Sequence, residues 1–278
     1  MRRLPRLLRR AGRTWVSALG ALLLAASVAA AVAGPAVAPR SPIDIAIQDR
    51  LQAPSARHWF GTDQYGRDVL SRALWGSRYS VGAAFTAVTL ATIAGGLLGL
   101  VGGYGGGWPD WAIMRACDVF LAFPGLLLAI GVAAVLGAGI KSIVIALAIV
   151  YAPRMARVMR GAALPVRQME YIEAARSEGA GAARIMLRHV LPNCFPALIV
   201  QGSISFSQIL LAEAALSFLG LGEPPPTPTW GAMLSEGKDF LTTAPWVAIF
   251  PGLCISACVL GLNLVGDALR DILDPRLS

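Results

Sequence analysis

Long apolar runs, separated by short polar segments, dominate the chain. Each approaches the length of about 20 residues that an α-helix needs to cross the hydrocarbon core of a membrane. The six runs are Trp15 to Ala36, Tyr79 to Tyr104, Val119 to Ile140, Gly137 to Arg157, Val190 to Leu219 and Pro245 to Val265. The fourth is the weakest because it lies between Lys141 and Arg154, whose long side chains must reach toward the membrane surface. The pattern predicts an all-α membrane protein with six transmembrane helices.

Composition supports the membrane assignment. Of the 278 residues, 56% are hydrophobic and 14% are charged, whereas a soluble domain carries about 25% charged residues. The net charge of +8 comes almost entirely from arginines that border apolar runs. They form no coherent basic face of the kind that nucleic acid requires, so nucleic-acid binding is excluded. The four cysteines lie in or beside apolar segments without a CxxC motif, which argues against a disulfide framework and a structural zinc site.

Arginine placement predicts the orientation of the chain. Six arginines and no acid occupy residues 1–14, and seven more lie in residues 154–188. Both regions can lie in the cytoplasm only if an even number of spans separates them. Counting the weak fourth helix gives four spans, so this requirement supports it. We therefore expect both termini in the cytoplasm. A cleaved signal peptide at the first run is less consistent, since cleavage would place the second basic region outside and Pro39 just after the cut.

The pattern divides the chain into four parts. They are a basic cytoplasmic N-terminus (1–14), a first transmembrane helix (15–36), an external segment (37–78), and a five-helix core (79–278) that includes a cytoplasmic segment at 160–193. The external segment carries six arginines and four aspartates. We expect it to be folded and internally paired, because longer loops cross the membrane despite their charge. The glycines in the second run are typical of close helix packing.

The cytoplasmic segment 168–193 reads QMEYIEAARSEGAGAARIMLRHVLPN. Val166, Met169 and Ile172 have the spacing of one helix face, and Gly179 and Gly181 permit a sharp turn. Two interpretations follow from the residues alone. The segment is either an amphipathic helix on anionic lipid or a helix that docks on another protein.

Several motifs resemble those of a known transport family. Glu173-Ala174-Ala175, Gly179 and Leu191-Pro192 resemble the EAA loop of bacterial binding-protein-dependent ABC importers. His189 replaces the isoleucine usual before Leu-Pro, a departure found in the peptide-transport branch. The segments that resemble the C-type dipeptide, oligopeptide and nickel permeases of that branch are Phe60 to Arg72, Leu216 to Leu234 and Asn263 to Leu277. The resemblance covers nearly the whole chain.

The resemblance implies a permease subunit of an importer in the bacterial cytoplasmic membrane. It implies a second homologous permease, two cytoplasmic ATPase subunits and an external solute-binding protein as partners. The residues implied in ATPase coupling are Glu173, Ala174, Ala175, Gly179, Leu191 and Pro192. The external signature comprises Gly61, Thr62, Asp63, Gly66, Arg67 and Asp68. Di- or oligopeptides are the expected cargo, with nickel or another small solute such as glutathione as the alternative.

Catalytic motifs are missing from the sequence. Neither Lys141 nor Lys238 stands in a P-loop, which needs glycine, four residues and then Gly-Lys-Ser/Thr. The only histidines, His58 and His189, exclude an HExxH motif, and no GxSxG nucleophile motif occurs. We expect a transport subunit without a cofactor or metal of its own, with ATP and magnesium bound by the partner ATPases. A membrane-embedded enzyme and a passive scaffold are the rival functions.

Five acidic residues have roles that the sequence alone leaves open or only suggests. Glu213 lies deep in the fifth run, where it either faces the translocation pathway or braces neighbouring helices by a hydrogen bond. Asp118 is expected to pair with Arg115 or Arg154. Glu173 either pairs with a group in the ATPase groove or forms a surface pair with Arg176. The external acids Asp63 and Asp68, together with Arg67, either contact the binding protein or stabilise their own loop, and we expect the latter.

Overall fold

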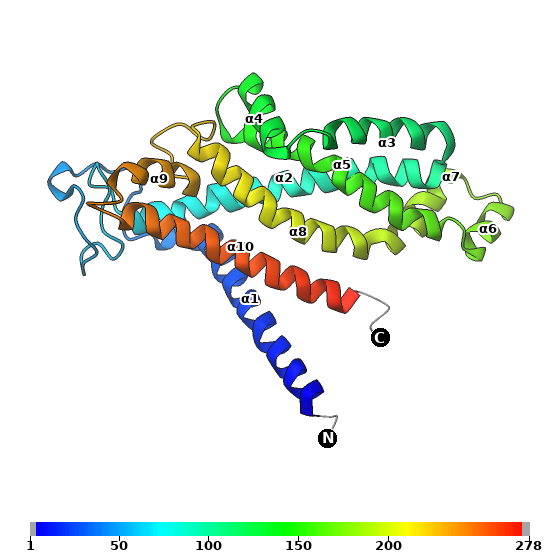
Figure 1. The fold of residues 1–278 in the computed structure, drawn as a ribbon, viewed down its shortest axis with the longest axis horizontal. Helices are drawn as coiled ribbons and strands as arrows, with labels where there is room; N and C mark the ends of the chain where they lie inside the picture. Colours follow the sequence, from blue (N-terminus) through cyan, green and yellow to red (C-terminus); the bar gives the residue numbers. More distant parts are fainter. Residues whose placement is uncertain (1–3, 274–278) are drawn as a thin grey trace.

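The computed structural model describes the backbone of residues 4–273 and the side chains of residues 15–272. Its helices are α1 (Leu4–Val37), η1 (Ile47–Asp49), α2 (Val69–Gly105), α3 (Gly107–Leu121), α4 (Gly125–Leu136), α5 (Ile140–Val166), α6 (Glu170–Ser177), α7 (Ala182–Ile185), η2 (Met186–Val190), α8 (Leu191–Phe218), α9 (Trp230–Gly237), η3 (Lys238–Phe240) and α10 (Trp246–Leu273). Residues 1–3 of the predicted N-terminal segment and 274–277 of the C-terminal motif lie outside the described range. Figure 1 shows an elongated helical bundle.

The predicted all-α membrane fold is confirmed. Within the described residues, five helical stretches are long and apolar enough to span a membrane: Trp15–Val37, Val69–Gly105, Ile140–Val166, Ala182–Phe218 and Trp246–Ile272. A sixth candidate span is the pair α3 and α4, which is bent by 92°. The predicted third span was a single run from Val119 to Ile140, and the structure corrects it. Pro124 stands at the break, because its ring and missing amide hydrogen prevent one continuous helix.

Helices α2 and α5 form the centre of the bundle. Gly95 and Gly99 lie one turn apart on α2, where an added Cβ would come within 2.2 Å of the carbonyl oxygens of Ala152 and Ala156 on α5. Only glycine allows this approach of the two backbones, as expected for helices that pack through small residues in a membrane. Gly95 and Gly99 therefore serve helix packing, as the sequence predicted for this run.

Helix α1 packs against α10 and α2 between Gly20 and Gly34, and its N-terminal part diverges from the bundle (Figure 1). Its closest contact with α10 is at Gly20, where an added Cβ would lie 2.5 Å from the Cβ of Leu264. A second close contact joins Gly34 to the backbone of Leu74 on α2. Between residues 15 and 37, most of the apolar surface of α1 is nevertheless exposed in the isolated chain.

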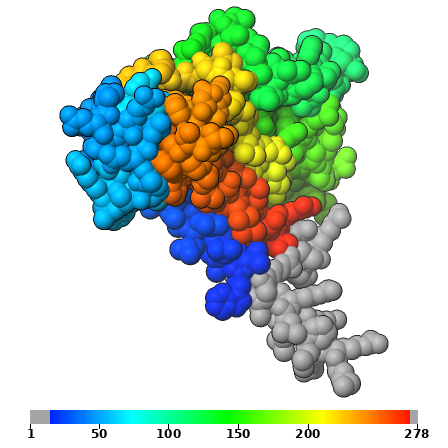
Figure 2. All heavy atoms as spheres, turned by 60° about the vertical axis from the view of Figure 1, so that its left-hand side comes forward, coloured from blue at the N-terminus to red at the C-terminus, as the bar shows by residue number. Residues whose placement is uncertain are grey.

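The segment 38–68 and helix α9 lie side by side at one end of the bundle, and together they are called the external cap (Figure 2). Helix α2 begins at Val69, before the expected start at Tyr79. The cause is a helix cap: the carboxylate of Asp68 accepts the N–H of Ser71 at 2.9 Å. Helix α6 lies at the opposite end, toward which α10 runs (Figure 1).

Candidate functional site

Residues 170–193, called the coupling segment, emerge at the end of the bundle opposite the external cap (Figure 1). Helix α6 is held by Ile172, whose side chain is fully buried in a cluster with Leu100, Met159 and Val190. This cluster joins α6 to the ends of α2, α5 and α8. Through this cluster, α6 packs against the ends of three spans.

The turn after α6 explains the requirement for glycine at position 179. Gly179 has a φ of 82°, in the left-handed region that L-residues avoid. Its N–H donates to the carbonyl of Arg176 at 2.9 Å, and the N–H of Ala180 donates to the carbonyl of Ala175 at 3.0 Å. These two bonds form a Schellman motif, which ends a helix and reverses the chain. Gly181 has a φ of −65°, which any residue can adopt.

The entry into α8 is wound more loosely than an α-helix. Residues Met186–Val190 form a π-helical turn, and the N–H of Leu191 donates to the carbonyl of Met186 five residues earlier. Pro192 follows and has no N–H to continue the regular ladder. The side chain of Asn193 donates to the carbonyl of His189 at 2.7 Å and adds a bond across this turn. Such irregular turns are frequent where a helix takes part in function.

The six residues expected to couple to an ATPase divide into two groups. Ala175 and Leu191 are half-buried against the bundle, whereas Glu173, Ala174, Gly179 and Pro192 are exposed. Among residues 15–272 the carboxylate of Glu173 has no ion-pair partner, so the alternative pairing with Arg176 is not formed. The guanidinium of Arg176 instead lies 5.4 Å from the centre of the Tyr104 ring at the end of α2. Glu173 is thus exposed and forms no ion pair within residues 15–272.

Ion pairs connect α3 to α5 near the same end. Arg160 binds both carboxylate oxygens of Asp110, with the Nη2–Oδ2 distance at 2.6 Å. Asp118 accepts from Arg157 on α5 and lies 3.6 Å from Arg115. The expected pairing with Arg115 is therefore present, but the alternative with Arg154 is wrong. Arg154 points to α8, where its Nη1 donates to Oε1 of Gln208 at 2.6 Å.

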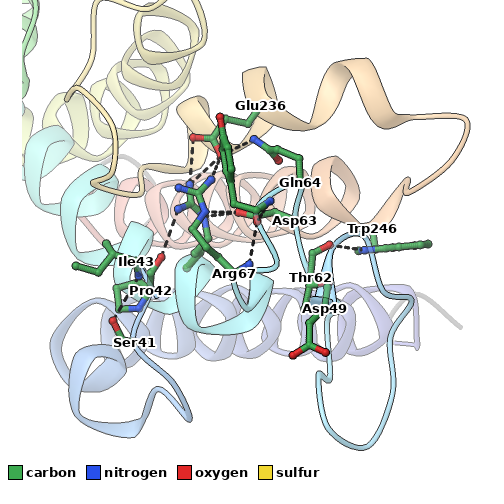
Figure 3. Close-up of polar contacts among 12 residues, drawn as sticks. Ser41, Pro42, Ile43, Asp49, Thr62, Asp63, Gln64, Arg67, Glu236 and Trp246 are labelled. Carbon is green, nitrogen blue, oxygen red and sulfur yellow. Dashed lines mark hydrogen bonds and ion pairs between the residues drawn. The ribbon is translucent and has the colours of Figure 1, made fainter. Parts of the chain in front are cut away.

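The external cap is held together by buried charges (Figure 3). Arg67 Nε donates to Asp63 Oδ2 at 2.6 Å, and Arg67 Nη2 donates to Glu236 Oε2 at 2.7 Å. Arg72 contacts the same two acids, with its Nη2 at 3.0 Å from Glu236 Oε2 and its Nε at 3.4 Å from Asp63 Oδ2. Two arginines and two acids from the segment 38–68, α2 and α9 thus form one network. Sequence reasoning missed Glu236.

The remaining residues of the external signature also stabilise the cap. The Oδ1 atom of Asp68 accepts a hydrogen bond from Nδ1 of the buried His58 ring, at a distance of 3.0 Å. The backbone carbonyl of Thr62 accepts a hydrogen bond from the indole N–H of Trp246 at 3.1 Å. Gly61 and Gly66 have φ angles of 73° and 74°, and a Cβ on Gly66 would lie 1.8 Å from the carbonyl oxygen of Ala46. The signature residues brought together here therefore shape the loop itself.

Glu213 lies inside the chain. It is 0% exposed, and its Oε1 accepts from the hydroxyl of Ser217 at 2.9 Å. Ser80 of α2 lies beside the same carboxyl group and accepts the N–H of Trp230 at 3.1 Å. Of the two alternatives, this position in the isolated chain favours bracing of α8 against α2 and α9. Among the described residues, no group of three or more His, Cys, Asp or Glu side chains could hold a metal ion.

Comparison with known proteins identifies a family and several relatives with similar sequences. The family model described as binding-protein-dependent transport system inner membrane component matches residues 91–278. The chain is 43% identical over 260 residues to the dipeptide transport system permease protein DppC of Alkalihalophilus pseudofirmus, covering 94% of this chain and 86% of that protein. It is 45% identical over 271 residues to the glutathione transport system permease protein GsiD of Escherichia coli, covering 97% and 89%.

A solved structure has the same fold. A chain from inward-facing conformations of the MetNI methionine ABC transporter superposes with a TM-score of 0.58 at 18% sequence identity. The match covers 74% of this chain and 96% of the other. The helices of the two chains are therefore arranged in the same way over the matched part.

Proposed function

The chain belongs to the family of binding-protein-dependent transport system inner membrane components, and from that premise we propose that it carries di- or oligopeptides into the cell. It is a multi-pass permease subunit of an ATP-binding-cassette importer. Relatives named for dipeptide and glutathione transport, at 43% and 45% identity, support a peptide as cargo. Glutathione is itself a peptide, so the two names agree on the class of cargo.

The proposal includes the partners and the orientation. A second homologous permease completes the pathway, two ATPase subunits bind at the cytoplasmic end, and a solute-binding protein delivers cargo at the external cap. Both termini lie in the cytoplasm. Arginine-rich stretches at residues 1–14 and 154–188 support this orientation. ATP and magnesium belong to the ATPase partners, because this sequence has no P-loop.

The observation that carries the proposal is the form of the coupling segment. Ile172 is buried on one side of α6, and Glu173 is exposed on another without an internal partner among the described residues. Such a helix is anchored to its own bundle and still offers a charged group to a second protein. When ATP binding closes the ATPase subunits, α6 moves with them. The Ile172 cluster passes the motion to α2, α5 and α8, which shift between inward-open and outward-open packings.

A reconstituted system tests this function. The permease is purified with the permease and ATPase chains encoded beside it, and the complex is placed in proteoliposomes with the neighbouring solute-binding protein. We expect cargo-loaded binding protein to stimulate ATP hydrolysis and to drive uptake of a radiolabelled dipeptide. ATP hydrolysis by this chain alone would contradict the assignment, as would ATP-driven uptake of nickel without uptake of any peptide.

A further inference from the structure

Helices α5, α8 and α10 lie side by side and present one continuous face (Figure 1). Exposed polar side chains on these helices include Arg154 on α5, Gln208 on α8 and Asn263 on α10. Gln201 lies two helical turns from Gln208 on the same side of α8. Asn263 accepts from the hydroxyl of Ser207 at 2.7 Å, which joins α10 to α8. Contact between lipid and several amide and guanidinium groups on neighbouring helices is energetically unfavourable.

Arg154 is the most informative of these residues because it is the charged one. It lies near the middle of the 27-residue helix α5, so about 20 Å of helix separates it from either end at a rise of about 1.5 Å per residue. Because α5 is about 40 Å long and the hydrocarbon core is about 30 Å thick, the helix extends beyond the membrane. Arg154 is the first arginine of the stretch 154–188, so it lies where α5 approaches the predicted cytoplasmic side. A charged group at this boundary is accommodated where it faces water or a polar partner.

The contacts of Arg154 leave most of its donors free. One N–H is used by Gln208 at 2.6 Å, and the guanidinium lies 5.9 Å from the ring centre of Tyr151. Among residues 15–272 no carboxylate lies within ion-pair distance of it. Arg157, one turn further along α5, differs because Asp118 already compensates its charge. Arg154 is therefore an uncompensated cation with several N–H groups available to an anion.

We propose that Arg154 lines the translocation pathway and binds the carboxylate of the peptide as it passes. This inference rests on the proposed peptide function and adds a binding residue to it. A guanidinium matches a carboxylate through two parallel N–H···O bonds, a geometry that every free peptide C-terminus can meet regardless of side chains. Gln208 positions the guanidinium, and Tyr151 supports its face. The positive charge opposes passage of a bare divalent cation, which argues against nickel as cargo.

Two measurements on the reconstituted complex test the proposal. The first compares peptide uptake by the wild type with that by Arg154→Gln, Arg154→Lys and the neighbouring control Ile149→Ala. We expect uptake to fall about ten-fold in Arg154→Gln and less in Arg154→Lys, which keeps the charge but loses the paired geometry. Ile149 lies in an apolar groove with Leu98 and Phe120, and its variant should transport like the wild type.

The second measurement uses chemical labelling. In a permease whose four native cysteines are replaced by alanine, a charged thiol reagent should modify Arg154→Cys, and saturating cargo should slow the reaction. Ile149→Cys should stay unmodified. Wild-type uptake in Arg154→Gln, or an unreactive Arg154→Cys, would overturn the proposal. If Arg154→Gln instead lost the second permease during purification, Arg154 would be a subunit contact and the proposal would fail. Failure of the wild-type complex to transport any peptide would overturn the proposed function separately.

Discussion

Arg67 and Glu236 stand 169 positions apart in the sequence and form an ion pair with 2.7 Å between Nη2 and Oε2. The pair fastens the segment 38–68 to α9 (Figure 3). The same carboxylate also binds Arg72 at 3.0 Å. One acid thus compensates two buried cations, and the external cap depends on it.

Replacement of Glu236 should therefore destabilise the cap. Glu236→Gln keeps the shape of the side chain but leaves Arg67 and Arg72 with only Asp63 as counter-ion. Breaking a buried ion pair by removing one partner costs about 3 kcal/mol. We expect a lower melting temperature in detergent and faster proteolysis within residues 38–68. Asp239→Asn alters an exposed acid three residues away and should melt like the wild type. Equal melting of both variants would refute the role of the network.

The turn at Gly66 should tolerate no side chain. Its φ of 74° and the 1.8 Å distance from an added Cβ to the Ala46 carbonyl both oppose alanine. We expect Gly66→Ala to lower the free energy of unfolding by at least about 2 kcal/mol. Gly82 on α2 has nothing within 4 Å of an added Cβ, so Gly82→Ala should be neutral or slightly stabilising. Thermal unfolding in detergent measures both variants, and a Gly66→Ala protein as stable as Gly82→Ala would show that the turn accepts a side chain.

Gly179 should matter for coupling more than for folding. Nothing lies within 4 Å of an added Cβ there, so Gly179→Ala strains only the backbone at a φ of 82°, which costs about 1 to 2 kcal/mol. The strain should shift α6 and lower peptide uptake about three-fold without preventing assembly. Gly181→Ala is the matched control, because a φ of −65° suits alanine. Equal uptake by the two variants would show that the turn geometry is not needed.

Glu213 should be inaccessible from the pathway. Its carboxyl group is fully buried beside Ser217 and Ser80. In the cysteine-free permease, Glu213→Cys should therefore resist a charged thiol reagent, whereas Leu219→Cys, just beyond α8 and exposed, should react. Rapid modification of Glu213→Cys that cargo blocks would instead support the pathway alternative.

The features that could be predicted from sequence are those set by local pattern. Apolar run length indicated the helical fold, and the Gly179 turn followed from glycine spacing. The third span was misplaced because its first half, from Gly107, carries Trp108, Asp110 and Arg115, which interrupt the apolar run. The pairing of Asp110 with Arg160 offsets that polarity only in the folded bundle.

Long-range pairing was beyond the sequence pattern. Glu236 looks like an ordinary acid in a short helix, and only the fold brings it to Arg67. Asp118 was expected to pair with Arg115 or Arg154, but Arg157 on α5 is the near partner. Arg154 could not be distinguished from the other arginines by charge. Its lack of a carboxylate partner among the described residues depends on which neighbours the fold brings to it.

ATP-driven peptide uptake by the complex with Glu173→Ala decides whether α6 transmits the ATPase motion. The exposed Glu170 at the start of α6 provides the matched control, Glu170→Ala. We expect Glu173→Ala to lower uptake about ten-fold while the complex still assembles, because the charged contact that moves α6 is lost. Glu170→Ala should keep most of the uptake. Wild-type uptake by Glu173→Ala would contradict the role of this helix as the element that transmits the ATPase motion through Glu173.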